Sequence, residues 1–392
     1  MTEADSSAHV AEDTEAEARR LVEELSVDIG PRLAGSSEEA AAAEWLAGKL
    51  REAGFETTIE PFRTPSSFAL LYGLLAILSL VAFGMAFVVP LAAAVLGLAA
   101  FGLMIVEVHT VECASYLVPR VTSRNAIGRR SAEREPRQTV VLTAHIDSAE
   151  GGVAFHPRLV KAFRALFVLM AISMVLIPGL AFLHWLGAPR AILYAAAPLA
   201  LHLLVCLALL GQQHFLAPVV AGGGDNASGV AALILVARAL RRLEATELWI
   251  VGTGAEEAGL FGMLRLLRAH EFDRATTYFL NVDSVVSPGL RLNSAEGMVV
   301  MKAADPHLLE VARAAAEKAG IEVAVGPSRV ISSDAVVPLV RNYRVMTIAG
   351  GDIRHWHWVT DVADHVAPEG PANAAEVLCR TIRALDREVA GA

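Results

Sequence analysis

The chain has 392 residues, enough for one large domain with additions or for two domains. Hydrophobic residues make up 54% of it and charged residues 19%, which is an apolar balance for a water-soluble protein of this size. The net charge of −9 argues against a nucleic acid as partner, and the three scattered cysteines indicate neither a disulfide framework nor a thiolate metal site.

The first segment of the chain is polar and predicts helix. Its opening residues, "MTEADSSAHVAEDTEAEARR", are acidic and contain no apolar core, so we expect no cleavable signal peptide. Residues 15–53 predict helical structure, because "SSEEAAAAEWLAGKLREAGF" begins with a Ser-Ser-Glu-Glu cap and stops at Gly54.

Two long apolar blocks interrupt the polar sequence. Residues 68–106 contain no charged side chain and are long enough for two bilayer crossings of about 20 residues each, with Pro90 as the natural turn. Residues 165–210 form a second block, which Gly187, Pro189 and Arg190 divide into another pair. Two buried hairpins in a soluble core would be the alternative, but the lengths favour four transmembrane helices. We therefore expect a multi-pass protein of the cell membrane.

Two hairpins leave every polar segment on one side of the bilayer. The tight turns contain only Arg190, whereas the polar flanks are rich in basic residues. Because Lys and Arg are enriched in cytoplasmic segments, we expect the polar part in the cytoplasm. The expected order is an N-terminal helical part (1–66), hairpin 1 (67–107), a first catalytic segment (108–162), hairpin 2 (163–212) and the main catalytic segment (213–392).

The polar segments predict an α/β fold. Short apolar runs, such as "TVVLTA" and "ELWIVGTG", alternate with helical patterns, such as the one that follows "GGGDNASG" and the one at residues 305–319. Near-continuous apolar strands are typical of a mostly parallel sheet that is buried on both faces. We expect a mostly parallel central sheet flanked by helices, into which the two hairpins are inserted.

Residues able to bind a metal or carry a proton follow the strands or open the next helix. In chain order they are His145, Asp147, Asp225, Glu256, Glu257, Asp283 and His357. In open α/β sheets function gathers outside the carboxyl ends of the strands, so these residues should converge. Taken singly, Asp225 is an ordinary helix N-cap and the glutamate pair an ordinary helix start. Their joint occurrence in a chain poor in charge favours a functional site.

Two imidazoles and several carboxylates suit zinc, and also manganese or cobalt. One bridging carboxylate, two terminal carboxylates and two imidazoles would give each of two metals three protein ligands. Of Glu256 and Glu257, one would bind a metal and the other would move a proton. Asp147 points the same way as His145 along an extended chain and can fix the tautomer of that imidazole.

The motifs resemble those of metallopeptidase family 28, the co-catalytic di-zinc exopeptidases. The similar stretches are "AHIDS", "GGGDNASG", "GAEEAGLFG", "NVDS" and "HWVTDVADHV". The resemblance implies that Asp225 bridges two zinc ions and forms a cis bond to Asn226. It further implies that His145 and Asp283 complete one zinc site, that Glu257 and His357 complete the other, and that Glu256 is the general base. His357 is preferred to His355 because it stands four residues before Asp361.

The resemblance implies a zinc exopeptidase that acts on peptides, most simply an aminopeptidase, and the two apolar blocks predict that it is embedded in the membrane. A carboxypeptidase or another amidase stays open, as does a glutaminyl cyclase, which shares the fold but uses a single zinc. A catalytically silent membrane scaffold is the alternative from another class, and the intact Glu256 argues against it. The sequence indicates nothing about the oligomeric state.

Overall fold

The computed structural model describes residues 3–328, 332–351 and 354–391. The chain divides into two compact units, and both apolar blocks fall in the second. Unit 1 comprises residues 1–64, 121–149 and 219–392, and unit 2 comprises residues 65–120 and 150–218. Unit 2 thus includes residues 108–120 and 150–162, which the sequence analysis assigns to the first catalytic segment.

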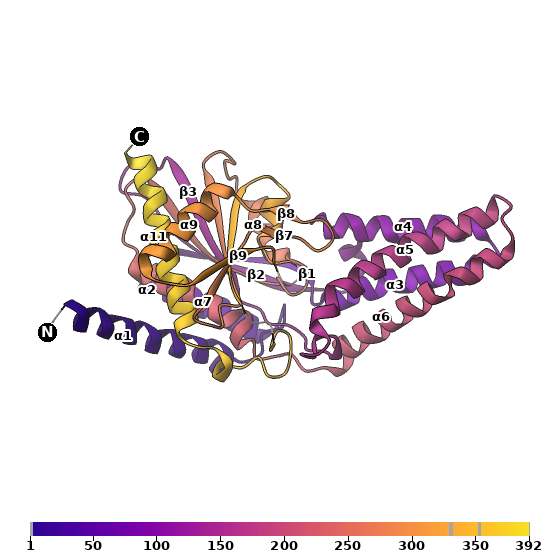
Figure 1. Cartoon of the computed structure of the whole chain (residues 1–392), viewed down its shortest axis with the longest axis horizontal. Coiled ribbons are helices and arrows are strands. Elements are labelled where there is room, and N and C mark those ends of the chain that lie inside the picture. The colour runs from indigo at the N-terminus through magenta and orange to yellow at the C-terminus, as the bar shows by residue number, and fades with distance from the viewer. Residues whose placement is uncertain (1–2, 329–331, 352–353, 392) are drawn as a thin grey trace. The chain divides into compact units, whose positions relative to one another are not determined.

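Unit 1 is an α/β fold built on an eight-stranded mixed sheet of strand order β1-β2-β4-β3-β5-β10-β6-β9 (Figure 1). Strands β4, β3, β5 and β10 run parallel, and β2 and β6 pair antiparallel with β4 and β10. The strands are β1 (Glu56–Pro65), β2 (Arg120–Arg130), β3 (Gln138–His145), β4 (Thr246–Thr253), β5 (Thr277–Asp283), β6 (Leu290–Asn293), β9 (Val323–Gly326) and β10 (Arg344–Gly350); β7 (Ala295–Glu296) and β8 (Lys302–Ala303) form a separate pair.

Helices cover both faces of this sheet. They are α1 (Glu3–Glu23), α2 (Ser37–Glu52), α7 (Gly229–Ala239), α8 (Phe261–Ala269), α9 (Pro306–Ala319), α10 (Val336–Leu339) and α11 (Glu369–Ala390). Alternate residues of β3 face opposite cores. Val140 and Leu142 belong to the core that includes α1, α2, α7, α9 and α11, whereas Val141 belongs to the core that includes α8 and α10. Burial on both faces explains why the central strands are apolar throughout.

Local signals placed several helix ends correctly. Ser36 caps α2 by accepting the backbone N–H of Glu39, as the Ser-Ser-Glu-Glu start predicts. Asp305 caps α9 in the same way, and Gly320 ends that helix in the left-handed conformation.

Unit 2 consists mainly of four long helices that lie side by side as a bundle (Figure 1). They are α3 (Phe68–Met85), α4 (Pro90–Val108), α5 (Phe163–Trp185) and α6 (Ala197–Leu216). Pro178 lies inside α5, and Pro90 begins α4 as expected. The segments 68–85, 90–108, 160–185 and 190–216 are long and apolar enough to cross a membrane.

The sheet is less uniformly parallel than the sequence analysis expects. The sequence patterns did not predict β1, β2, β6 and β9, nor the long C-terminal helix α11. Strands β6 and β9 have only four residues each, and the burial of β1 alternates instead of being continuous. Short or half-exposed strands of this kind lack the continuous apolar run by which the central strands were recognised.

Candidate metal centre

The carboxyl ends of the parallel strands bring the expected residues together. His145 ends β3, Asp283 ends β5, and Glu256 and Glu257 lie in the turn after β4. Asp225 lies in the Gly-rich turn before α7, and its peptide bond to Asn226 is cis, as the resemblance implies. The parallel direction of β3, β4 and β5 is what places these ends at one edge of the sheet.

Asp225 lies at the centre of the cluster. One carboxylate oxygen, Oδ1, is 2.8 Å from Nε2 of His145, and the other, Oδ2, is 3.1 Å from Nε2 of His357. Nε2 of His357 is also 2.9 Å from Oε2 of Glu257. Two groups of three possible metal ligands therefore share this carboxylate: His145, Asp225 and Asp283 in one, and Asp225, Glu257 and His357 in the other.

Glu256 belongs to a third group, with His145 and Glu257, whose ligand atoms lie within 4.8 Å of one another. Its side chain is 9% exposed. Burial raises the pKa of Glu256 well above its ordinary value, and Glu257, Asp334 and Asp283 raise it further, whereas His145 opposes the shift. A carboxylate whose pKa is raised by burial and like charges suits proton transfer near neutral pH.

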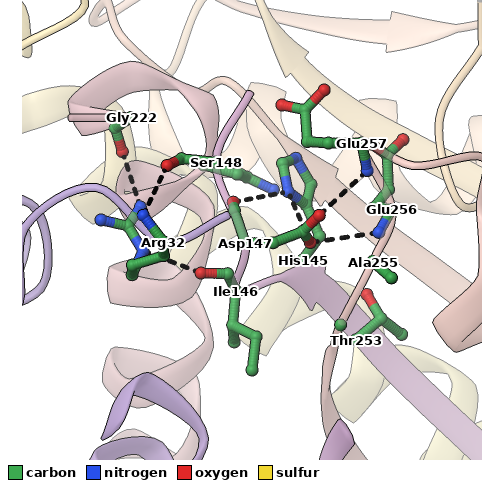
Figure 2. Close-up of polar contacts among 12 residues, drawn as sticks. Arg32, His145, Ile146, Asp147, Ser148, Gly222, Thr253, Ala255, Glu256 and Glu257 are labelled. Atoms are coloured by element: carbon green, nitrogen blue, oxygen red, sulfur yellow. Dashed lines mark hydrogen bonds and ion pairs between the residues drawn. The ribbon is translucent and has the colours of Figure 1, made fainter. Parts of the chain in front are cut away.

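Asp147 supports the turn that carries the two glutamates. Its Oδ1 accepts the backbone N–H of Glu256 and its Oδ2 accepts that of Glu257 (Figure 2). Nδ1 of His145 lies 3.1 Å from the backbone carbonyl of Asp147 and 3.6 Å from its carboxylate. The carbonyl, and not the carboxylate as expected, is thus in hydrogen-bonding distance of the imidazole.

Asp361 supports the turn that carries Asp225. Its carboxylate accepts the backbone N–H groups of Gly224 and Asp225 at 2.6 and 3.1 Å. Burial raises the pKa of Asp361 to about 7, and the nearby Asp225 adds to this shift. The sequence analysis used Asp361 only as a spacing mark for His357, and no local pattern indicated that it binds this distant turn.

The charges of the cluster fit a cation. Burial opposes the charge of His357, but Glu257 and Asp225 raise its pKa to about 10. Burial and Asp225 raise the pKa of Asp283 to about 7, whereas the two imidazoles lower that of Asp225 despite its burial. Oε1 of Glu257 is buried and has no hydrogen-bond partner among the described residues. Two imidazoles and three carboxylates without a thiol match the ligands of catalytic zinc.

His355, the rejected alternative to His357, lies outside these groups. Its Nδ1 is 2.7 Å from Oγ1 of Thr360, and its ring stacks on that of His365 with centroids 4.1 Å apart. Trp356 stacks on the ring of His357.

A cavity of about 550 Å³ adjoins the centre and is lined by Asp225, Asp283, Asn293, Ser333 and Trp356, among others.

Several buried charged residues near the centre were missed by the sequence analysis as parts of the site. Glu39 appeared there only as part of a helix cap, yet it is fully buried and accepts the backbone N–H of Ala255, next to Glu256. Asp334, by contrast, lies in "SSDAVVPLV", a stretch that also resembles a substrate-side segment of family 28; it is buried and accepts a hydrogen bond from Thr253. Arg32 is fully buried as well. Charged side chains are almost never fully buried without a partner, but burial cannot be deduced from a single sequence.

The comparisons with known proteins concern the family and the fold of the chain. The sequence model of peptidase family M28 matches residues 209–382. No curated protein matches the chain. Among solved structures, a zinc aminopeptidase from Bacillus subtilis is similar, with a TM-score of 0.56 and 16% identity over 96% of this chain and 95% of that one.

Two further structures show the same fold. An aminopeptidase from Aneurinibacillus sp. strain AM-1 has a TM-score of 0.56 and 14% identity over 94% of this chain and 93% of its own. A glutaminyl cyclase from Bacteroides thetaiotaomicron has a TM-score of 0.53 and 16% identity over 95% and 97%. The M28 match and the zinc aminopeptidase fold support a metallopeptidase hydrolase.

Proposed function

We propose that this chain is a membrane-bound, zinc-dependent exopeptidase, and specifically an aminopeptidase that removes N-terminal residues from peptides. The observation that carries the proposal is the pair of ligand groups that share Asp225, with Glu256 beside them. A shared carboxylate between two sets of ligands is the arrangement that a paired-metal hydrolase needs.

His145, Asp225 and Asp283 would hold one zinc ion, and Asp225, Glu257 and His357 the other. Such ions polarise a carbonyl and lower the pKa of water, so that a nucleophile forms at neutral pH. Glu256 takes the proton from the attacking water and passes it to the leaving amine. Asp147 positions both glutamates through its hydrogen bonds to their backbone N–H groups. Manganese or cobalt would suit the same ligands.

The size of the cavity fits a short segment of substrate. Its volume of about 550 Å³ is in the range of small-molecule sites, and it adjoins Asp225 and Asp283. A site of this size accommodates the end of a peptide better than the middle of a folded chain. The volume of the cavity therefore favours an exopeptidase, acting at either end of a peptide.

The membrane part of the proposal rests on unit 2. Its four helices expose large apolar side chains, among them Val95 at 62%, Leu201 at 61% and Leu204 at 53%. Outward-facing apolar surface on helices of this length favours a lipid environment. The bias of basic residues toward the polar segments favours a cytoplasmic catalytic unit. Extraction of the protein by alkaline carbonate would contradict the assignment to the membrane. Protease access to unit 1 from outside intact cells would contradict the cytoplasmic assignment.

Product analysis by mass spectrometry tests the activity. Detergent-purified protein of measured zinc content is incubated with a mixed peptide pool, in parallel with Glu256→Gln. Stepwise loss of N-terminal residues by the wild type alone is the expected result. Loss from the other end would identify a carboxypeptidase. If the zinc-loaded wild type cleaves no peptide, the aminopeptidase proposal is wrong.

A glutaminyl cyclase is the second candidate, since one of the similar structures bears that name. Peptides that begin with glutamine distinguish the two reactions. Cyclisation releases ammonia and keeps every residue, whereas an aminopeptidase releases free glutamine. Metal content gives an independent measure, because the two ligand groups predict two zinc ions per chain.

A further inference from the structure

Arg32 is a fully buried arginine in unit 1 whose side chain binds only backbone carbonyl groups among the described residues. Nε donates to the carbonyl of Ile146 at 2.8 Å, and Nη2 donates to that of Gly222 at 3.1 Å (Figure 2). Nη1 lies within 3.0 Å of the carbonyl oxygens of Leu25, Gly30 and Ala221. The guanidinium thus contacts three segments that are far apart in the sequence.

Two of these segments carry metal ligands. Ile146 directly follows His145, and Gly222 lies three residues before Asp225. The backbone of Arg32 adds a second connection, because its N–H donates to Oγ of Ser148 while that hydroxyl donates to the carbonyl of Val220. Arg32 and Ser148 therefore join the loop that carries His145 to the loop that carries Asp225.

The second loop is shaped to meet the arginine. Gly222 has φ +62°, in the left-handed region, and a Cβ atom there would lie 3.0 Å from Nη2 of Arg32 and 2.7 Å from Cβ of Ser148. Only glycine allows both the conformation and the close approach at this position. The contact between Arg32 and this loop is thus specific in shape as well as in hydrogen bonding.

The charge of Arg32 is a separate matter from its geometry. Burial lowers the pKa of Arg32 to about 10, whereas Asp147, Asp361, Asp225 and Glu257 act in the opposite direction. A positive charge near a metal site repels cations, so its removal alone would strengthen zinc binding. Loss of the connection between the two loops would weaken zinc binding, because the groups behind the ligands hold them in place. When Arg32 is replaced, the two roles therefore predict opposite changes in zinc affinity.

We propose that Arg32 is a positioning residue that sets the separation of the His145 and Asp225 loops and thereby the zinc affinity of the centre. The inference rests on the proposed metal-dependent function, because it concerns the ligands of that centre. The geometric role outweighs the repulsion, because five carbonyl groups accept hydrogen bonds from this one side chain.

The test compares three variants of the full chain in detergent. Arg32→Met removes both the fork of donors and the charge, and Arg32→Lys keeps the charge without the fork. Arg130→Met is the matched control, because Arg130 also binds backbone carbonyls, those of Ala53, Ala237 and Leu240, but in segments that carry no metal ligand. Zinc affinity is measured by competition with a chelator, and the cobalt-substituted protein reports ligand geometry through its visible spectrum.

We expect Arg32→Met to weaken zinc binding by about 10–100-fold, the range found for groups behind metal ligands. Arg32→Lys should weaken it as well and change the cobalt spectrum, although its charge is retained. Arg130→Met should lower the melting temperature but leave zinc affinity within about twofold of the wild type. Unchanged or tighter binding by Arg32→Met, or wild-type affinity and spectrum in Arg32→Lys, would overturn the proposal.

If Arg32→Met does not fold, Arg32→Lys and Ser148→Ala decide the question, since the latter removes only the second connection. Weaker zinc binding by Arg32→Lys supports the proposal, and weaker binding by Ser148→Ala extends it to the second connection; wild-type affinity and spectrum in Arg32→Lys refute it whatever Ser148→Ala shows. Failure of the proposed function would be visible separately: the wild type itself would bind no zinc, or would bind zinc and cleave no peptide.

Discussion

Two turns of unit 1 present the proposed metal ligands, and an aspartate carboxylate holds each turn in the same manner. The turn at Glu256 and Glu257 is held by Asp147, which follows β3 directly and is two residues from a ligand. The turn at Asp225 is held by Asp361, which lies well over a hundred residues further along the chain. In each case one carboxylate accepts two successive backbone N–H groups. The difference shows that a residue holding such a turn can be noticed in the sequence when it lies close to a ligand motif. An equivalent residue from a distant loop cannot.

The largest effect should distinguish the role of Glu256 in proton transfer from the role of Glu257 in metal binding. Glu256→Gln should lower kcat by about 10²–10⁴-fold, the usual contribution of a general base, while two zinc ions remain bound. Glu257→Gln should instead lose zinc, because it removes a ligand. Zinc content and turnover of both variants, measured on the same preparations, check this division. Loss of zinc from Glu256→Gln with retention in Glu257→Gln would reverse the assigned roles.

The second-largest effect should distinguish the two aspartates that hold these turns, Asp147 and Asp361, by their influence on kcat. Asp147→Asn and Asp361→Asn each replace an acceptor of two N–H groups by an amide that accepts less, and we expect about 10–100-fold weaker zinc binding in both. Only Asp147→Asn should also lower kcat in zinc-saturated protein, because only its turn carries Glu256. Chelator competition and turnover at saturating zinc distinguish these outcomes. An equal loss of kcat in the two variants would contradict the separation of the turns.

The pH dependence of stability gives a third, smaller effect. Burial and Asp147 raise the pKa of Glu39 in the folded protein from its ordinary value of 4.5 to about 8. Since the folded pKa is the higher one, its stabilising contribution is present below about pH 4.5 and is lost as the pH rises through about 8. The melting temperature of the metal-free protein should therefore fall between these values. It should fall less in Glu39→Gln, and a steeper fall there would contradict the raised pKa.

The smallest effect concerns His355. This residue lines the cavity but belongs to neither ligand group, so His355→Ala should change zinc affinity by no more than about twofold, equivalent to about 0.4 kcal/mol. His357→Ala, measured beside it, should lose zinc. If His355→Ala lost zinc instead, the choice between the two histidines would be wrong.

Much of unit 1 was predictable where the signal is local. The central strands β3, β4, β5 and β10 were recognised as apolar runs, α2 by its cap and α9 by its helical pattern. Short strands at the sheet edges, such as β6 and β9, were missed because a few residues carry no periodic signal. The residues of the two ligand groups were named in advance because each belongs to a recognisable motif.

The sequence by itself determined the order of the motifs, the apolar character of the four long helices and the chemical nature of the seven site residues. Only the tertiary structure decided how these residues are supported. Arg32, Glu39 and Asp361 are buried beside them through contacts with segments far away in the chain. The physical reason is that a hydrogen bond to a backbone group depends on where that backbone lies and not on which residue it belongs to, so such partners leave no pattern in one sequence.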